Sequence, residues 1–248
     1  MSVPLRPEGV LIDAAADAPP VALDELAPPG GLLVLVPHPD DESLGCGRAL
    51  AAAAAAGRRI AIVLLTDGEG SHPGSASHPP RTLAALRARE MEAALWLLVD
   101  GVHLRGLRLG LPDGRTTPAA ALDRADEVER LSREVGARAI WTTWGRDPHC
   151  DHEAAAALAG ALGRRLGVPV WSYAVWGRFG DAGKGASGVR RFDDPAQAAR
   201  KSAAIAAHRS QMTRLVDDAP DAFVMPPALA RHFAEAPEIF LPGTGLDD

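Results

Sequence analysis

An apolar segment that ends abruptly in a histidine and three carboxylates constrains this chain more than any other feature. Leu32 to Val36 are five apolar residues in a row, which is typical of a strand buried on both faces of a sheet. The next six residues are Pro37-His38-Pro39-Asp40-Asp41-Glu42, and an alanine-rich segment follows them. Because charge beside a buried strand needs a neutralising partner, this crowding predicts a bound cation.

Further apolar runs alternate with helical segments along the chain. Arg59–Leu65, Ala137–Thr142 and Val168–Val175 have the apolar character of buried strands, and segments with helical spacing separate them. This alternation predicts an α/β fold with a doubly wound, mainly parallel sheet and helices on both faces, a Rossmann-like architecture. In such sheets ligands bind beyond the carboxyl ends of the strands.

Length sets the expected domain organisation. The chain has 248 residues, enough for one sizeable α/β domain. We expect residues 1–30 to form an irregular lead-in packed on the body, with one helical turn near Leu23–Leu26, and residues 31–248 to form a single domain. Within it, Val102–Leu104 is expected to be a short strand and Pro118–Val135 one helix, and Ser43 or Glu42 is expected to cap the helix after the first strand.

Charge and composition exclude several classes of partner. The net charge is −6 without a basic tract, so we expect no nucleic-acid partner. The sequence has no apolar stretch long enough for a membrane span, and Met1 to Asp13 lack the features of a signal peptide. Two cysteines, Cys46 and Cys150, make no disulfide framework, which favours a reduced, cytoplasmic location. A homo-oligomer is compatible with the sequence.

A second polar cluster follows the strand at Ala137–Thr142. It contains His149-Cys150-Asp151-His152 and precedes another helical segment. The fold is therefore expected to bring both clusters to one edge of the sheet. Two imidazoles and one carboxylate, as in His38, Asp41 and His152, suit a catalytic zinc with an open position for water. Fe²⁺ or another borderline divalent ion would also accept this set.

Each cluster taken alone has a simpler interpretation. Pro-Asp and Asp-Pro pairs favour turns, and acidic residues favour helix N-termini, so either segment matches a capped loop. The presence of two such clusters at equivalent places in an alternating α/β pattern favours the metal interpretation.

Together the two clusters resemble the PIG-L/LmbE-like zinc-dependent N-acetylglucosaminyl deacetylases. The resemblance extends over nearly the whole chain, with Pro37–Glu42 and His149–His152 as its specific motifs. Weaker matches follow in the same order: Thr66-Asp67-Gly68-Glu69, Arg87-x-x-Glu90, Pro112-Asp113-Gly114, Lys201-x-x-x-Ile205-x-x-His208-x-Ser210-Gln211 and Pro237-Glu238-Ile239-Phe240.

The resemblance implies a metal-dependent hydrolase that removes an acetyl group from an N-acetylglucosamine-type sugar or glycoconjugate. It implies that His38, Asp41 and His152 hold the metal. It further implies that Asp40 is the general base, which agrees with the ability of a carboxylate to accept a proton from an activated water.

The resemblance also implies roles for residues around the metal. His149, in its protonated form, would add a second positive group that stabilises the oxyanion of the tetrahedral intermediate. Asp151 would orient a histidine or favour its charged form. Arg87 and Asp113 would contact sugar hydroxyls, although an ion pair of Arg87 with Glu90 explains that arginine equally well.

Other residues receive no catalytic role from the resemblance. Lys201 and His208 are expected to serve packing. Val99 and Cys150 depart from the family pattern, in which a glycine and a proline are common at these places. We expect the Cys150 side chain to point away from the metal.

Three other interpretations compete with this one. His149-x-Asp151-His152 is half of the HxHxDH string of metallo-β-lactamase-like hydrolases, but Asp147 stands where the first histidine belongs. Gly45-x-Gly47 suggests a dinucleotide site, yet Leu50 stands where the third glycine belongs. The third is a non-catalytic carbohydrate-binding domain of the same fold, and the complete set of site residues argues against it.

Overall fold

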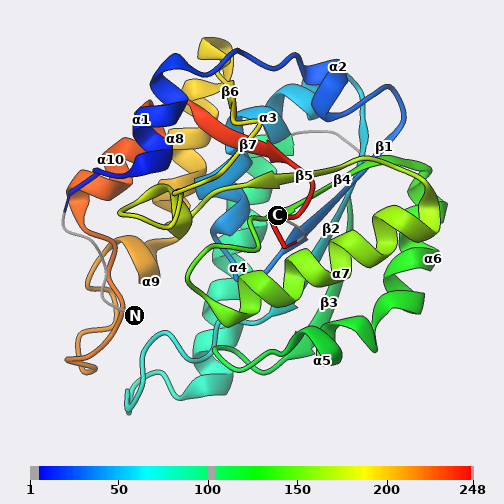
Figure 1. The fold of residues 1–248 in the computed structure, drawn as a ribbon. Coiled ribbons are helices and arrows are strands. Elements are labelled where there is room, and N and C mark those ends of the chain that lie inside the picture. The colour runs from blue at the N-terminus through cyan, green and yellow to red at the C-terminus, as the bar shows by residue number, and fades with distance from the viewer. Residues whose placement is uncertain (1–5, 100–103, 247–248) are drawn as a thin grey trace.

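The computed structural model describes residues 6–99 and 104–246, which form a three-layer arrangement around one sheet (Figure 1). The seven strands lie in the order β3-β2-β1-β4-β5-β7-β6. Neighbours from β3 to β5 are parallel, whereas β7 is antiparallel to both β5 and β6. The strands are β1 Gly31–Val36, β2 Arg59–Thr66, β3 Leu104–Leu111, β4 Ala137–Thr143, β5 Val170–Tyr173, β6 Arg190–Phe192 and β7 Glu238–Pro242.

The strand that anchors the first polar cluster lies in the middle of the parallel part. Every residue of β1 is buried, and β1 pairs with β2 on one side and β4 on the other. Most residues of β2 and β4 are buried as well, so hydrophobic burial on both faces stabilises this part of the sheet. The predicted doubly wound, mainly parallel sheet is confirmed.

Helices cover both faces of the sheet (Figure 1). One layer packs its apolar face on β1, β2 and β4 through residues such as Leu50, Leu98 and Ile205. It consists of α3 Asp41–Ala55, α4 Pro80–Val99, α8 Ala198–Ala207 and α10 Pro227–Glu235. The other layer packs through Val128 and Leu158. It consists of α5 Pro118–Leu122, α6 Ala125–Val135 and α7 Cys150–Leu166.

The remaining helices are α1 Val10–Asp17, α2 Leu23–Leu26, α9 Arg209–Met212, η1 Trp176–Arg178 and η2 Pro195–Gln197. Within residues 6–99 and 104–246, no helix has the length and apolar character that crossing a bilayer requires.

Several local expectations are wrong. The lead-in contains the helix α1, whose Leu11 is buried, in addition to the expected turn at α2. The structure has an edge strand over Leu104–Leu111, where only Val102–Leu104 was expected to be a strand. The glycines at 106 and 110 obscure the strand pattern in the sequence, and Val102 and His103 lie outside the described residues. The helix expected over Pro118–Val135 is interrupted after Leu122.

The helix that follows β1 is also interrupted. Cys46 in α3 has φ −139° and ψ 22°, which is not helical, so backbone groups on either side lose their helical partners. Glu238 of β7 accepts hydrogen bonds from the N–H groups of Arg48 and Ala49, at 2.7 and 2.9 Å. Lys201 of α8 donates to the carbonyl oxygen of Leu44 at 2.9 Å and pairs with Glu238 at 2.6 Å. The buried ion pair therefore replaces the hydrogen bonds that the break removes.

Close packing explains the two glycines beside this break. A Cβ atom on Gly45 would lie 2.2 Å from the Tyr173 ring, and one on Gly47 would lie 3.2 Å from the Lys201 side chain. The Gly-x-Gly pattern thus serves helix packing, and the dinucleotide interpretation loses its only support.

Replacing Lys201 by methionine is expected to lower the free energy of unfolding by about 3–5 kcal/mol, because Glu238 would be left buried without its cation. Urea denaturation measures the change. The chain has one other lysine, Lys184, whose pair with Asp181 is exposed. Lys184→Met is the matched control and is expected to change the free energy of unfolding by less than about 1 kcal/mol. Equal effects of the two substitutions would contradict the role given to Lys201.

Candidate metal centre

The two polar clusters meet at the carboxyl ends of neighbouring strands. Residues 37–42 follow β1, and residues 144–152 follow β4, which is parallel to β1 and adjacent to it. His38 and His152 are both buried there, with ring centroids 5.4 Å apart. The expected convergence of sequence-distant residues on one edge of the sheet is confirmed.

One carboxylate oxygen lies between the two imidazoles. Asp41 Oδ2 is 3.1 Å from His38 Nδ1 and 3.3 Å from His152 Nε2. The backbone N–H of His38 also donates to this oxygen at 3.0 Å, which fixes the Asp41 side chain at the start of α3. The predicted ligands His38, Asp41 and His152 are therefore close neighbours.

Each imidazole is held from behind by a second carboxylate. His38 Nε2 lies 2.9 Å from Asp151 Oδ2, and His152 Nδ1 lies 2.9 Å from Asp147 Oδ2. Asp147 itself accepts hydrogen bonds from three backbone N–H groups of residues 175–177. A carboxylate on the outer nitrogen of a histidine fixes the ring and directs the inner nitrogen inward, an arrangement that metal-ligating histidines usually have.

The residues present fit a divalent metal. Among the described residues, buried His152 Nε2 has no hydrogen-bond partner but faces Asp41 Oδ2 at 3.3 Å, so it offers a lone pair or a proton toward that carboxylate. Two ligands of a tetrahedral zinc, each about 2.0–2.1 Å from the ion, lie about 3.3 Å apart. The spacing from Asp41 to each imidazole matches that value, whereas the compact set of ligand atoms that contains both imidazoles has His149 as its third member. Nitrogen and carboxylate donors suit zinc and also Fe²⁺.

The third histidine, His149, also lies near this group. Ring nitrogens of His38, His149 and His152 lie within 4.8 Å of one another. His149 caps the N-terminus of α7 by accepting the N–H of Asp151 at its Nδ1 atom, at 3.2 Å. In the neutral ring the hydrogen therefore resides on Nε2. Burial and the positive charges of His38 and His152 lower the pKa of His149 to about 4, which favours this neutral form.

The charge balance of the site also favours a cation. Burial works against ionised Asp41, but His152 and His38 hold the pKa of that carboxyl well below its usual range. Burial alone would lower the pKa of His38 and of His152, but the surrounding carboxylates have the larger effect. They raise the pKa of His38 well above its ordinary value and the pKa of His152 to about 9. The imidazole nitrogens of His38 and His152 thus bind protons tightly. A divalent ion would compete with these protons for the same atoms.

Asp40 occupies a strained position beside the predicted ligands. Its φ is 144°, a region that residues with side chains rarely adopt, and strain of this kind often occurs at functional sites. Glu42 accepts the backbone N–H of Asp40 at 3.3 Å, and Arg87 donates to Pro39 O at 2.8 Å and to Asp40 Oδ2 at 3.3 Å. Burial raises the pKa of Asp40 to about 6, although Arg87 opposes the shift.

The helix after β1 starts differently from the expectation. Its N-cap is Asp40, so neither Ser43 nor Glu42 is the cap. Glu42 and Ser43 instead contact His208 of the segment between α8 and α9: Ser43 Oγ lies 3.1 Å and Glu42 Oε1 lies 3.5 Å from His208 Nε2. His208 therefore supports the turn that holds Asp40, which sequence analysis did not anticipate.

A cavity of about 520 Å³ opens over these residues. Both predicted sugar contacts line it. Asp113 lies 3.3 Å from His38 Nε2 and accepts the N–H of Gly70 at 2.7 Å. Arg87 makes no ion pair with Glu90, which instead binds Ser210. The lining residues are His38, Asp40, Asp41, Gly70, Ser71, Pro73, Arg87, Asp113, Gly114, His149, Trp176, Gln211, Asp221, Ala222, Phe223 and Val224.

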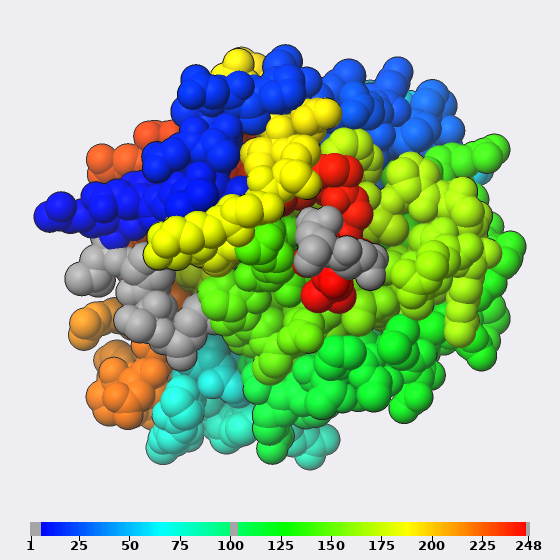
Figure 2. All heavy atoms as spheres, in the orientation of Figure 1, coloured from blue at the N-terminus to red at the C-terminus, as the bar shows by residue number. Residues whose placement is uncertain are grey.

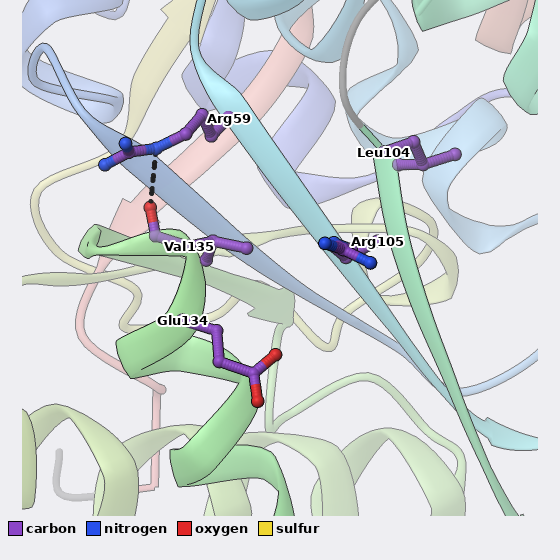
Figure 3. Close-up of a pocket in the computed structure, with 5 residues that line it drawn as sticks. All are labelled: Arg59, Leu104, Arg105, Glu134 and Val135. Atoms are coloured by element: carbon purple, nitrogen blue, oxygen red, sulfur yellow. Dashed lines mark hydrogen bonds between the residues drawn. The ribbon is translucent and has the colours of Figure 1, made fainter.

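A second cavity, of about 420 Å³, lies at the opposite end of the sheet (Figure 3). Arg59, Leu104, Arg105, Glu134 and Val135 line it, and Arg59 donates to the Val135 carbonyl. These five lining residues include neither histidine nor aspartate, so this cavity lacks the combination of imidazoles and aspartates that lines the first.

Sequence analysis missed the supporting role of Asp147. For Cys150 it predicted a side chain that points away from the metal. Asp147 lies five residues before His152, and no spacing rule marks a carboxylate at that distance as the support of an imidazole. Cys150 is exposed and donates to Asp151 Oδ1 at 3.3 Å, so the sulfur contacts the carboxylate that holds His38.

Replacing Asp147 by asparagine is expected to lower metal affinity about 10- to 100-fold, because His152 would lose the carboxylate that fixes its ring. Competition titration with Zn²⁺ and a chromophoric chelator measures the affinity. Asp181→Asn, at an exposed site, is the control and should bind metal as the unaltered protein does. Unchanged affinity in Asp147→Asn would contradict the supporting role.

Comparison with known proteins identifies relatives over most of the chain. A protein-family model described as PIG-L, GlcNAc-PI de-N-acetylase, matches residues 33–162. No protein of curated function matches the chain.

Solved structures share the fold. One is N,N'-diacetylchitobiose deacetylase from Pyrococcus horikoshii, at 19% identity and TM-score 0.67, matched over 96% of this chain and 91% of that one. Another is the zinc-inhibited form of a teicoplanin deacetylase, at 21% identity and TM-score 0.63, over 86% and 97%. A conserved protein from Thermus thermophilus is 31% identical with TM-score 0.55, over 73% and 80%.

Proposed function

Because the chain belongs to the PIG-L family, we propose that it is a metal-dependent hydrolase that removes an acetyl group from an N-acetylglucosamine-type sugar or glycoconjugate. A shared fold does not determine a reaction, so the proposal depends on the site itself. The observation that carries it is the convergence of His38 and His152 on Asp41, with Asp40 and His149 in the same cavity.

The metal would be held by His38, Asp41 and His152, with Asp151 and Asp147 fixing the two imidazoles from behind. A divalent ion bound there supplies a Lewis acid that activates water at neutral pH and polarises an amide carbonyl. We propose Zn²⁺ as the native ion, with Fe²⁺ as the alternative, on the basis of the nitrogen and carboxylate donors.

Asp40 is proposed as the general base. Its carboxylate lines the cavity, and Arg87 and Glu42 hold it in a strained backbone conformation beside the ligands. It would accept the proton of the attacking water and later return it to the leaving amine nitrogen, so that an acetate and a free amino sugar are formed.

His149 is proposed to stabilise the oxyanion. Because its Nδ1 accepts the N–H of Asp151, its Nε2–H is available to donate toward the carbonyl oxygen of the acetamide. A donor placed in advance at developing negative charge lowers the barrier of acyl transfer. The neutral form is sufficient for this role, and a protonated His149 is not required.

Arg87 and Asp113 are proposed as sugar contacts on the wall of the cavity. Asp113 presents a carboxylate that can accept from a hydroxyl, and Arg87 would contribute mainly by holding Asp40.

Residues 31–248 are proposed as the catalytic domain. A cytoplasmic location is proposed from the two free cysteines, one buried and one exposed.

Acetate release tests this proposal. The purified protein would be loaded with Zn²⁺ or Fe²⁺ and incubated with N-acetylglucosamine, its glycosides and a panel of other N-acetylated amines. Acetate from the sugars, lost after chelation and restored by the metal, is expected. Binding of the sugars without acetate release under any metal would instead indicate a non-catalytic carbohydrate-binding domain.

A further inference from the structure

The lining of the catalytic cavity contains two kinds of side chain. The polar residues His38, Asp40, Asp41 and His149 share it with the apolar residues Pro73, Trp176, Ala222, Phe223 and Val224. The apolar side chains come from three segments far apart in sequence: the loop after β2, the turn η1 and the loop between α9 and α10. We define Pro73, Trp176, Ala222, Phe223 and Val224 as the apolar wall.

The apolar wall is built on fixed supports. The Asp218 carboxylate accepts four hydrogen bonds from Ser75, Ala76 and Ser77, at 2.6–2.9 Å, which ties the loop after β2 to the loop before α10. The N–H of Phe223 donates to Ser71 O at 3.0 Å. Figure 2 shows the two segments side by side, in cyan and orange at the lower left.

Aromatic packing sets the shape of the apolar wall. The rings of Trp176 and Phe223 meet edge to face with centroids 5.7 Å apart, and Trp176 packs from behind against Phe233 in the core, at 6.3 Å. Neither Trp176 nor Phe223 is fully buried, so both keep apolar surface toward the cavity. A rigid apolar surface of this kind binds an apolar group with little ordering cost.

The charges of the cavity limit the group that this surface can accept. Among the described residues that line it, Arg87 is the only Lys or Arg side chain, and its Nη atoms already donate to Pro39, Gly68 and Asp40. Asp221 adds a carboxylate beside Phe223. The exposed Arg115 follows the lining residue Gly114 without being part of the lining. A phosphate beside the apolar wall would face carboxylates and apolar surface without a dedicated cation.

We propose that the apolar wall selects an uncharged glycoside whose aglycone is apolar, with the ring or chain of the aglycone packed against Phe223 and Trp176. This inference rests on the proposed function, since it takes the sugar end to lie over the metal ligands. The cavity of about 520 Å³ falls in the range of sites for ligands larger than a single sugar ring.

Binding of the amino-sugar products tests the aglycone without requiring catalysis. Isothermal titration calorimetry on the zinc-loaded protein would compare glucosamine, phenyl β-glucosaminide, hexyl β-glucosaminide and glucosamine 1-phosphate. The phenyl and hexyl compounds are expected to bind at least about tenfold more tightly than glucosamine, because the aglycone leaves water for the apolar wall. The phosphate is expected to bind no more tightly than glucosamine.

Phe223→Ala is expected to reduce the preference for the phenyl compound to about twofold or less. Phe223→Leu keeps an apolar side chain and is expected to retain an intermediate preference for the phenyl compound. This result would show that the effect of Phe223→Ala comes from the lost apolar contact and not from misfolding. Trp96→Ala is the control, because Trp96 is 70% exposed on α4 and lies outside this cavity. It should retain both activity and the full preference.

Three results would overturn the inference: equal affinity for glucosamine and its phenyl glycoside, tightest binding of the phosphate, or a full preference in Phe223→Ala. The corresponding N-acetyl compounds, assayed for acetate, test the reaction separately. Tight aglycone-dependent binding of the products without acetate release would overturn the proposed function. It would still support the inference that the apolar wall binds an apolar aglycone.

Discussion

Replacing Asp41 by asparagine is expected to lower metal affinity more than 100-fold and to reduce acetate release to background. Asp41 Oδ2 is the atom that faces both imidazoles, at 3.1 and 3.3 Å. Its removal would take away one of three ligands and the negative charge that balances the ion. Loss of a ligand should exceed the 10- to 100-fold effect of losing an outer supporting group.

Metal content and affinity can be measured without activity. Elemental analysis after dialysis against Zn²⁺ gives the stoichiometry, and the visible spectrum of the Co²⁺ form reports the coordination of the ion. Asp67→Asn is a matched control, because Asp67 follows the neighbouring strand β2 and pairs with Arg108 away from the ligands. One tightly bound ion per chain in Asp41→Asn, with an unchanged Co²⁺ spectrum, would exclude Asp41 as a ligand.

Replacing Asp40 by asparagine is expected to reduce kcat about 10²- to 10⁴-fold while metal content stays unchanged. The amide has the size of the carboxylate but cannot accept a proton from water, and general-base catalysis contributes an effect of this order. The Glu42 and Arg87 contacts to the backbone around Asp40 would remain, so the turn should keep its conformation. Both substitutions are expected to reduce turnover, but only Asp41→Asn is expected to lower metal affinity. This difference would distinguish ligand from base, although the two aspartates are adjacent in sequence.

The pH profile adds a second measurement of the same role. In the metal-free site burial raises the pKa of Asp40 to about 6. Since the base must be ionised, kcat/KM should fall as the pH drops through the pKa of Asp40. A bound cation favours the carboxylate, so this limb should lie at or below pH 6 in the loaded enzyme. Retention of both turnover and the acidic limb in Asp40→Asn would remove Asp40 from the mechanism.

Sequence analysis predicted which residues of the candidate site lie close together because the evidence for them is local. The apolar run that becomes β1 stops immediately before His38, and strand ends in a parallel sheet mark where ligands bind. Sequence analysis did not predict the antiparallel edge of the sheet. There β6 and β7 are short strands that pair with each other, and β7 is distant in sequence from its other partner, β5. Nothing in their local pattern distinguishes them from loops.

The sequence by itself determined the α/β class, the central strands and the residue types that meet at their ends, because burial and alternation are encoded over a few adjacent residues. Only the tertiary structure decided which atoms face one another. His38 meets Asp151 across 113 residues, and Asp218 ties down Ser75 across 143. Such pairs depend on how the strands and loops are placed in space. The orientation of each imidazole, the support from Asp147 and the apolar wall therefore emerge only once the chain has folded.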